Sequence, residues 1–148
     1  MPQITIKIPG PPQAKMRHRS TKTGHIYDPN AENEDRAIAH IRAEARDHVP
    51  FVGALRADMV FVFERPKGHF GSGRNAGSLK ASAPMYCTCP KDFDNLAKFY
   101  CDAMNCIIYH DDRQIVASAQ EKRFAEAGEI PHVEIAITPL EPERENTL

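Results

Sequence analysis

The chain has 148 residues, of which 41% are hydrophobic and 26% charged, and its formal net charge is −1. These values are typical of one soluble globular domain with a substantial core. No apolar run approaches the roughly 20 residues of a membrane helix, and the N-terminus alternates like a strand instead of resembling a signal peptide. We therefore expect a single domain over residues 1–148, located in the cytoplasm and without a membrane partner.

Hydrophobic patterning predicts four strands and two helices. Four segments alternate like strands: 3–8, 57–64, 114–123 and 132–138. Two segments have helical periodicity: 31–48 and 94–105. The order is β-α-β-loop-α-β-β, which predicts an α/β fold, a single small domain with a mixed β-sheet and two main helices. Valines on the second face of 57–64 favour a central place for that strand.

Element boundaries and the remaining segments give further expectations. Asp28 or Asn30 can cap the first helix, and Asn105 can supply the left-handed residue that ends the second. Residues 66–91, rich in glycine and lysine, are expected to form a mobile basic loop, because a loop of this length in a compact domain is usually functional or disordered. Residues 139–148 are expected to form a frayed acidic tail.

The small net charge conceals two basic segments without acidic residues. Residues 1–27 and 65–91 each carry +5, so the remaining residues sum to −11. Two basic loops beside an acidic centre suit a polyanion that must reach a metal ion, although chance clustering on solvated loops explains the charges equally well. The candidate nucleic-acid contacts are Lys15, Arg17, Arg19, Lys22, Tyr27, Lys67, Arg74, Lys80 and Lys91. Tyr27 can either stack on a base or sugar or pack on the core.

A cluster of aspartates is the candidate catalytic centre. Asp92 and Asp94 stand at the start of the second helix, with Phe93 between them expected to point inward, and Asp111 and Asp112 follow that helix. Carboxylates brought together by such a unit suit a hard divalent cation such as Mg²⁺. Their mutual repulsion without a cation favours metal binding over a structural cluster. Mg²⁺ could then activate water and stabilise the leaving oxygen in phosphodiester hydrolysis.

Lys98 has two interpretations that its spacing does not separate. It follows Asp94 by one helical turn, so the two side chains can form an i,i+4 ion pair worth a few tenths of a kcal/mol. Alternatively, its ammonium contacts the scissile phosphate and stabilises charge in the transition state.

The four cysteines, Cys87, Cys89, Cys101 and Cys106, match no common zinc spacing. Disulfides are not expected in the cytoplasm, and no residue is clearly placed as the base for a cysteine nucleophile. Ordinary small side chains are the favoured interpretation, with a zinc-bound structural protein as the alternative.

Three central motifs resemble the RusA family of Holliday-junction resolvases. They are DFDNLAK at 92–98, DAMN at 102–105 and YHDDRQI at 109–115. The family pattern is roughly D-x-D-N-L-x-K, then D-A-L, then D-D-x-Q-V/I. Flanking segments, Pro11-x3-Lys15-x-Arg17-x-Arg19, Gly24-x2-Tyr27 and Pro66-Lys67-Gly68-His69, look like the phage and prophage branch. The likeness spans about residues 4–138.

The resemblance implies a homodimeric endodeoxyribonuclease of a bacterial or phage-infected cell that makes paired nicks in four-way DNA junctions, in recombination and repair. It implies Mg²⁺, with Mn²⁺ as a substitute. Asp92, Asp94 and Asp112 match the catalytic metal-binding aspartates, Lys98 matches the catalytic lysine, and Asp111 matches a further acidic position. Asp102 matches a motif residue for which capping or an inter-element hydrogen bond is expected.

The chain departs from the family pattern at two positions. Pro90-Lys91 stands where many members have Lys-Pro, and Cys87 stands near a histidine of many phage-branch members. Neither position is an expected ligand, but both could alter the shape of the loop and the cleavage preference. Two alternatives remain: a nucleic-acid-binding module without catalytic activity, and a nuclease for other branched DNA or for RNA.

Overall fold

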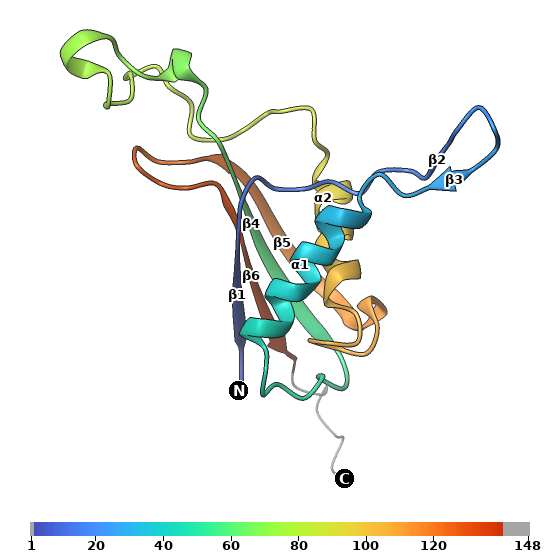
Figure 1. Cartoon of the computed structure of the whole chain (residues 1–148). Helices are drawn as coiled ribbons and strands as arrows, with labels where there is room; N and C mark the ends of the chain where they lie inside the picture. The colour runs from blue at the N-terminus through green and yellow to red at the C-terminus, as the bar shows by residue number, and fades with distance from the viewer. Residues whose placement is uncertain (1, 141–148) are drawn as a thin grey trace.

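The computed structural model describes residues 2–140 and has the predicted order of elements (Figure 1). The strands and helices are β1 (Ile4–Pro9), β2 (Arg19–Ser20), β3 (Ile26–Tyr27), α1 (Ala31–Glu44), β4 (Leu55–Phe63), α2 (Phe93–Met104), β5 (Ile115–Phe124) and β6 (His132–Pro139). Short 3-10 helices span Lys67–His69, Gly73–Asn75 and Asp112–Gln114. The predicted α/β class is confirmed. Within residues 2–140, every helix is too short or too polar to span a membrane.

The main sheet has four strands in the order β1-β6-β4-β5. β4 and β5 are parallel, whereas β6 is antiparallel to both β1 and β4. The sheet is therefore mixed, and β4 has a neighbour on each side, which confirms its predicted central place. α2 lies in the connection between the two parallel strands, as a crossover requires.

The parallel pair contains a β-bulge near its start. Leu55 pairs with Ile115, but the next residue, Arg56, pairs with Ala117, so Val116 is an extra residue without a partner in β4. The bulge breaks the alternation of β5. As a result, Ile115 and Ser118 both line the space beside α2, although three positions separate them.

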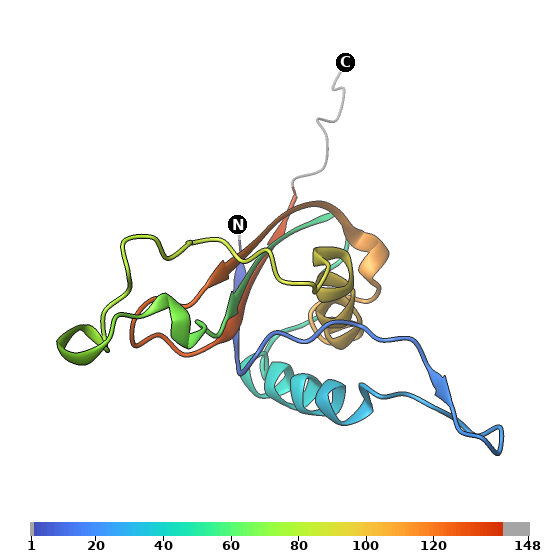
Figure 2. The same ribbon diagram turned by 90° about the horizontal axis from the view of Figure 1, so that it is seen from above.

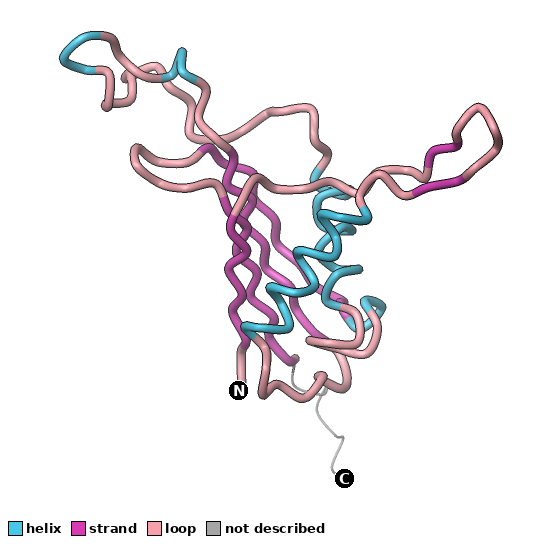
Figure 3. Tube along the Cα trace, in the orientation of Figure 1, coloured by secondary structure: helices cyan, strands magenta, loops and turns pink. Residues whose placement is uncertain are grey.

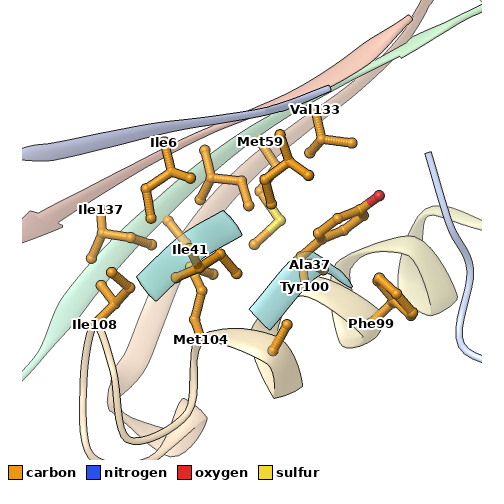
Figure 4. Packing of buried hydrophobic residues seen from close by; sticks show 14 of the residues in the cluster. Ile6, Ala37, Ile41, Met59, Phe99, Tyr100, Met104, Ile108, Val133 and Ile137 are labelled. Carbon is orange, nitrogen blue, oxygen red and sulfur yellow. The ribbon is translucent and has the colours of Figure 1, made fainter. Parts of the chain in front are cut away.

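Both helices pack on one face of the sheet, which is clear when the molecule is seen from above (Figure 2). Between sheet and helices lies the core, where Ile41 from α1, Met59 from β4 and Met104 from α2 meet (Figure 4). The predicted apolar stripe of α2, which comprises Leu96, Phe99, Tyr100 and Ala103, is buried throughout. Because this stripe is buried, the rotation of α2 about its axis is fixed, and with it the side of the helix that faces the edge strand β5.

The ends of the helices differ from the predictions. α1 stops at Glu44, four residues before the predicted end. The left-handed residue after α2 is Cys106, with φ 64°, instead of Asn105, because the helix ends at Met104 and the position two residues later takes that conformation. Phe93 was expected to point inward but is 56% exposed. Residues 92–95 are all exposed, so the first turn of α2 lies outside the core, which the helix enters at Leu96.

The first two residues of the predicted tail, 139 and 140, are ordered parts of the fold. β6 continues to Pro139, and the amide of Leu140 donates to the carbonyl of Ala54 at 3.0 Å. Residues 141–148 lie outside the described residues.

Two long excursions leave the same end of the sheet, where α2 also begins (Figure 3). The first, residues 17–29, contains the β2–β3 hairpin, where the sequence predicts only a loop. We call it the hairpin arm. The second, residues 66–90, contains two 3-10 helices, and we call it the glycine-rich arm. The two arms extend in different directions from the body, with the start of α2 between them.

Candidate active site

A hollow of about 290 Å³ lies between α2 and β5. The carboxylates of Asp94 and Asp112, the ammonium of Lys98 and the polar side chains of Ser118 and Gln120 line it. The remaining lining is apolar: Ala57, Met59, Ala97, Cys101 and Ile115. The fold thus brings together three of the four predicted catalytic residues from two separate segments of the chain.

Helical spacing and a capping box place these side chains. Asp94 lies in the first turn of α2 and Lys98 follows one turn later, on the side opposite the buried stripe. Asp112 begins a 3-10 helix whose start is capped by Asp111, because the Asp111 carboxylate accepts the amide of Arg113 at 2.9 Å. The Gln114 side chain accepts the Asp111 amide at 3.0 Å and donates to the Phe51 carbonyl at 2.9 Å. This network fixes the turn that carries Asp112.

Asp112 has an unfavourable electrostatic environment for its charge. Burial raises the pKa of this carboxyl above its usual range, and the neighbouring carboxyls of Asp111 and Asp102 raise the pKa further. Lys98 opposes that shift. The positive charge of Lys98 therefore does not fully compensate the negative charge of the carboxylates around Asp112. A divalent cation bound by oxygen donors would relieve this imbalance, so Asp94 and Asp112 fit Mg²⁺ chemically.

The predicted cradle of four carboxylates is not assembled in the described residues. Asp92 occupies the N-cap position of α2 and is exposed, and Asp111 is exposed and engaged in its capping box. Neither lines the hollow. Between residues 2 and 140, no three side chains of His, Cys, Asp or Glu group closely enough to hold a metal ion. Which carboxylates bind a metal ion stays a prediction.

Lys98 pairs with a different acid from the one its spacing suggested. Its Nζ lies 3.9 Å from Oδ1 of Asp102, one turn further along α2, and its side chain is 60% exposed. The other oxygen of Asp102 lies 3.5 Å from Nζ of Lys15, in the segment that leads into the hairpin arm. Asp102 therefore makes an ion pair between two elements, where capping or an inter-element hydrogen bond was expected. Nothing in the motifs indicated that Lys15 was its partner.

The loop that precedes Asp92 is held by two lysines. Lys122 on β5 donates to the carbonyl oxygens of Cys89 and Lys91, at 3.2 and 2.7 Å. Lys91 in turn donates from its Nζ to the carbonyl oxygen of Pro12 at 2.8 Å. These bonds connect the start of α2 to the sheet and to the N-terminal segment. Sequence reasoning missed Lys122, which sits in a strand with no motif of its own.

The nine candidate nucleic-acid contacts separate into two groups. Seven of them are exposed on the two arms: Arg17, Arg19, Lys22, Tyr27, Lys67, Arg74 and Lys80. Tyr27 is 41% exposed on β3 and does not belong to the core cluster. The other two, Lys15 and Lys91, are partly buried and have the intramolecular partners described above. Their ammonium groups face the protein.

Arg65, part of the basic segment 65–91, anchors the glycine-rich arm. It is 8% exposed, donates to the carbonyls of Ala125 and Pro84, and stacks over the Phe124 ring at 5.1 Å. Residues 85–87 then run beside β5, where the amide of Phe124 donates to the Met85 carbonyl at 2.9 Å. The base of this arm is therefore tied to the sheet. The mobility predicted for residues 66–91 remains a prediction.

The four cysteines are free thiols in the structure. Burial raises the pKa of the Cys101 thiol, which faces the hollow, to about 11. A thiol with that pKa is protonated at neutral pH, so Cys101 is a poor nucleophile.

Comparison with known families agrees with the resemblance that the motifs indicate. The family described as endodeoxyribonuclease RusA matches residues 9–138. No curated protein matches the chain. The matched range includes the hollow and both arms. The chain therefore belongs to the RusA family of endodeoxyribonucleases.

Proposed function

We propose that this protein is a Mg²⁺-dependent endonuclease that resolves four-way DNA junctions by paired nicks, in recombination and repair. Family membership supports hydrolysis of DNA. The observation that carries the proposal is the meeting of Asp94, Asp112 and Lys98 in one hollow. These are an acidic pair and a cation on a partly apolar surface, which suits a phosphodiester and its metal ion.

Asp94 and Asp112 would hold Mg²⁺, or Mn²⁺ in its place, and Asp92 and Asp111 offer further carboxylates from the adjoining turns. When bound, the ion supplies activation of water and stabilisation of charge at the phosphate. Lys98 would contact the scissile phosphate, since its side chain is 60% exposed and lines the same hollow.

The two arms would bind the DNA on either side of the hollow. Their exposed cations give a sequence-independent attraction for phosphates, and Tyr27 offers a ring for stacking on a base or sugar. Arms that extend in different directions suit a branched duplex better than a single straight one. A homodimer is part of the proposal, because a junction presents two symmetry-related strands for simultaneous nicking.

The test is cleavage of a synthetic four-way junction beside a linear duplex of the same sequence, with Mg²⁺ and with EDTA. Metal-dependent paired nicks in the junction alone are expected. Tight binding without cleavage in Mg²⁺ or Mn²⁺ would replace the proposal by a binding module without catalytic activity. Equal cutting of the duplex would support nuclease activity but would contradict selectivity for the junction structure. Preferential cutting of flaps or RNA would assign another substrate.

A further inference from the structure

Asp102 connects the hollow with the base of the hairpin arm. One carboxylate oxygen lies 3.9 Å from the Lys98 ammonium, and the other lies 3.5 Å from the Lys15 ammonium. The Asp102 and Lys15 side chains are 22% and 23% exposed, against 60% for Lys98. Lys15 also lies 3.5 Å from a carboxylate oxygen of Glu34 on α1. The bridge from Lys15 to Asp102 is thus partly shielded from solvent, and Lys98 is its exposed end.

Hydrogen bonds hold the main chain around Lys15 against the body of the protein. The Lys15 amide donates to the carbonyl of Asn95, in the first turn of α2, at 2.9 Å. Asn30, which is 2% exposed, clamps both neighbours: its side chain accepts the Met16 amide at 2.6 Å and donates to the Ala14 carbonyl at 3.1 Å. Asn30 was one of two candidate caps for α1 and occupies the N-cap position, but its side chain makes no cap hydrogen bond there. Lys15 therefore stays with the body, while the exposed Arg17 and Arg19 leave with the arm.

The charges around Asp102 are balanced through Lys15. Burial opposes the charge of Lys15, but Glu34 and Asp102 together raise its pKa above the usual value, so it is a permanent cation at neutral pH. Lys98 meets Asp102 at a longer distance than Lys15 does. Without Lys15, the Asp102 carboxylate would have Lys98 as its nearest cation and would draw that ammonium closer. Without Asp102, the Lys98 ammonium would lose the group that orients it.

We propose that Asp102 and Lys15 are positioning residues that hold the Lys98 ammonium at the hollow and connect its placement to the hairpin arm. This rests on the proposed role of Lys98 at the phosphate. Lys15 then acts through Asp102, and it does not contact DNA. The cations of the N-terminal basic segment consequently have two functions: Lys15 organises the site, and the cations that follow it meet the substrate.

The first test measures single-turnover cleavage of a four-way junction at saturating protein, together with junction binding in EDTA over a range of salt. Lys15→Met and Asp102→Asn are expected to slow cleavage about 10- to 100-fold, as a displaced catalytic group does. Both should keep the wild-type dissociation constant and salt slope. The double variant should be no slower than the slower single variant, because the two residues act through one ion pair. Lys15→Arg should restore much of the rate.

Arg42→Met is the matched control, since Arg42 is an exposed cation near the far end of α1, and it should cleave at the wild-type rate. Wild-type cleavage rates in Lys15→Met and Asp102→Asn would overturn the proposal. So would a reduced salt slope with a normal saturated rate in Lys15→Met, which would make Lys15 a phosphate contact. A wild-type protein that leaves the junction intact would instead overturn the proposed function.

A second readout needs no cleavage. Labelling of lysine amines with an acylating reagent, followed by mass spectrometry of the Lys98 peptide, reports how free that ammonium is in the protein alone. Lys15→Met should slow labelling of Lys98, because Asp102 then pairs with it closely, and Asp102→Asn should speed it. An unchanged labelling rate in both variants would refute the positioning role even if the protein cuts another substrate.

Discussion

The ammonium of Lys122 donates to the carbonyl oxygen of Lys91 at 2.7 Å, directly before the turn that carries Asp92 and Asp94. Lys122→Met removes this bond and the one to Cys89, and hydrogen bonds to a charged group contribute about 1.5–3 kcal/mol each. We expect a folded but less stable protein that cleaves slowly and exchanges the amides of residues 88–94 faster. Hydrogen exchange with mass spectrometry checks this. Lys80→Met, on the exposed arm, is the control, and unchanged exchange at 88–94 would refute the role.

Asp94→Asn tests the acidic pair in the hollow. The substitution keeps the size of the side chain and removes its charge, so we expect junction binding to persist while cleavage in Mg²⁺ is abolished. Asp94 is exposed in the first turn of α2, so the fold should tolerate the change. Gel-shift and cleavage assays on the same junction measure the two properties. Asp35→Asn is a matched control on α1, also exposed and acidic, and unchanged cleavage by Asp94→Asn would exclude the proposed site.

Arg17→Ala with Arg19→Ala tests the hairpin arm. If each arginine contacts one phosphate, the slope of log K against log salt should become less steep by about one for each arginine replaced. The control is Arg42→Ala with Arg46→Ala, two exposed arginines near the far end of α1 from the arms. Fluorescence anisotropy with a labelled junction gives both slopes. Equal slopes in the two double variants would show that the arm does not contact the DNA backbone.

The turn between β5 and β6 gives a prediction about pH. The Arg123 guanidinium, 2.6 and 3.0 Å from the two oxygens of Glu129, lowers the pKa of that carboxyl from 4.5 to about 2. A pKa lowered in the folded state stabilises the protein above pH 4.5, and this contribution is lost as the pH falls from 4.5 to about 2. Glu129→Gln should therefore lower the free energy of unfolding at pH 7, and the difference from wild type should shrink towards pH 3.

Urea unfolding at several pH values measures this difference. The control is Glu32→Gln, whose side chain is 81% exposed and pairs with Arg36 on the surface of α1, where such pairs contribute little. A difference between wild type and Glu129→Gln that stays constant from pH 7 to pH 3 would contradict the assignment to ionisation of Glu129.

Periodicity predicted the elements well where one face is buried. The alternation around Met59 and the helical stripe through Tyr100 identified β4 and α2, because burial of one face imposes a fixed spacing on apolar residues. A different argument failed at Phe93: its place between two aspartates expected to turn toward one metal ion predicted that it points inward, but it lies in a turn that is exposed. A local pattern does not reveal where the core ends.

Two of the four predicted carboxylates and the predicted lysine line the hollow, but the partners of these side chains were less predictable. Asp94, Lys98 and Asp112 belong to motifs, and the structure brings them together. The pairing of Asp102 with Lys15 joins residues far apart in the chain, so no local spacing could indicate it. Asn30 shows the same limit: its residue type suggests a cap, but its burial beside the arm gives it other partners.

The extra residue at Val116 decides which side chains of β5 face the hollow. A strand shifted by one position turns each of its side chains to the opposite face. If Val116 paired with Arg56 in a regular ladder, Ala117 and Ala119 would face α2 in place of Ser118 and Gln120, and the hollow would lose two of its polar groups without any change in the residues themselves. In an alignment of related chains, a one-residue gap at Val116 would therefore remove the bulge and leave the polar groups beside the carboxylates in place.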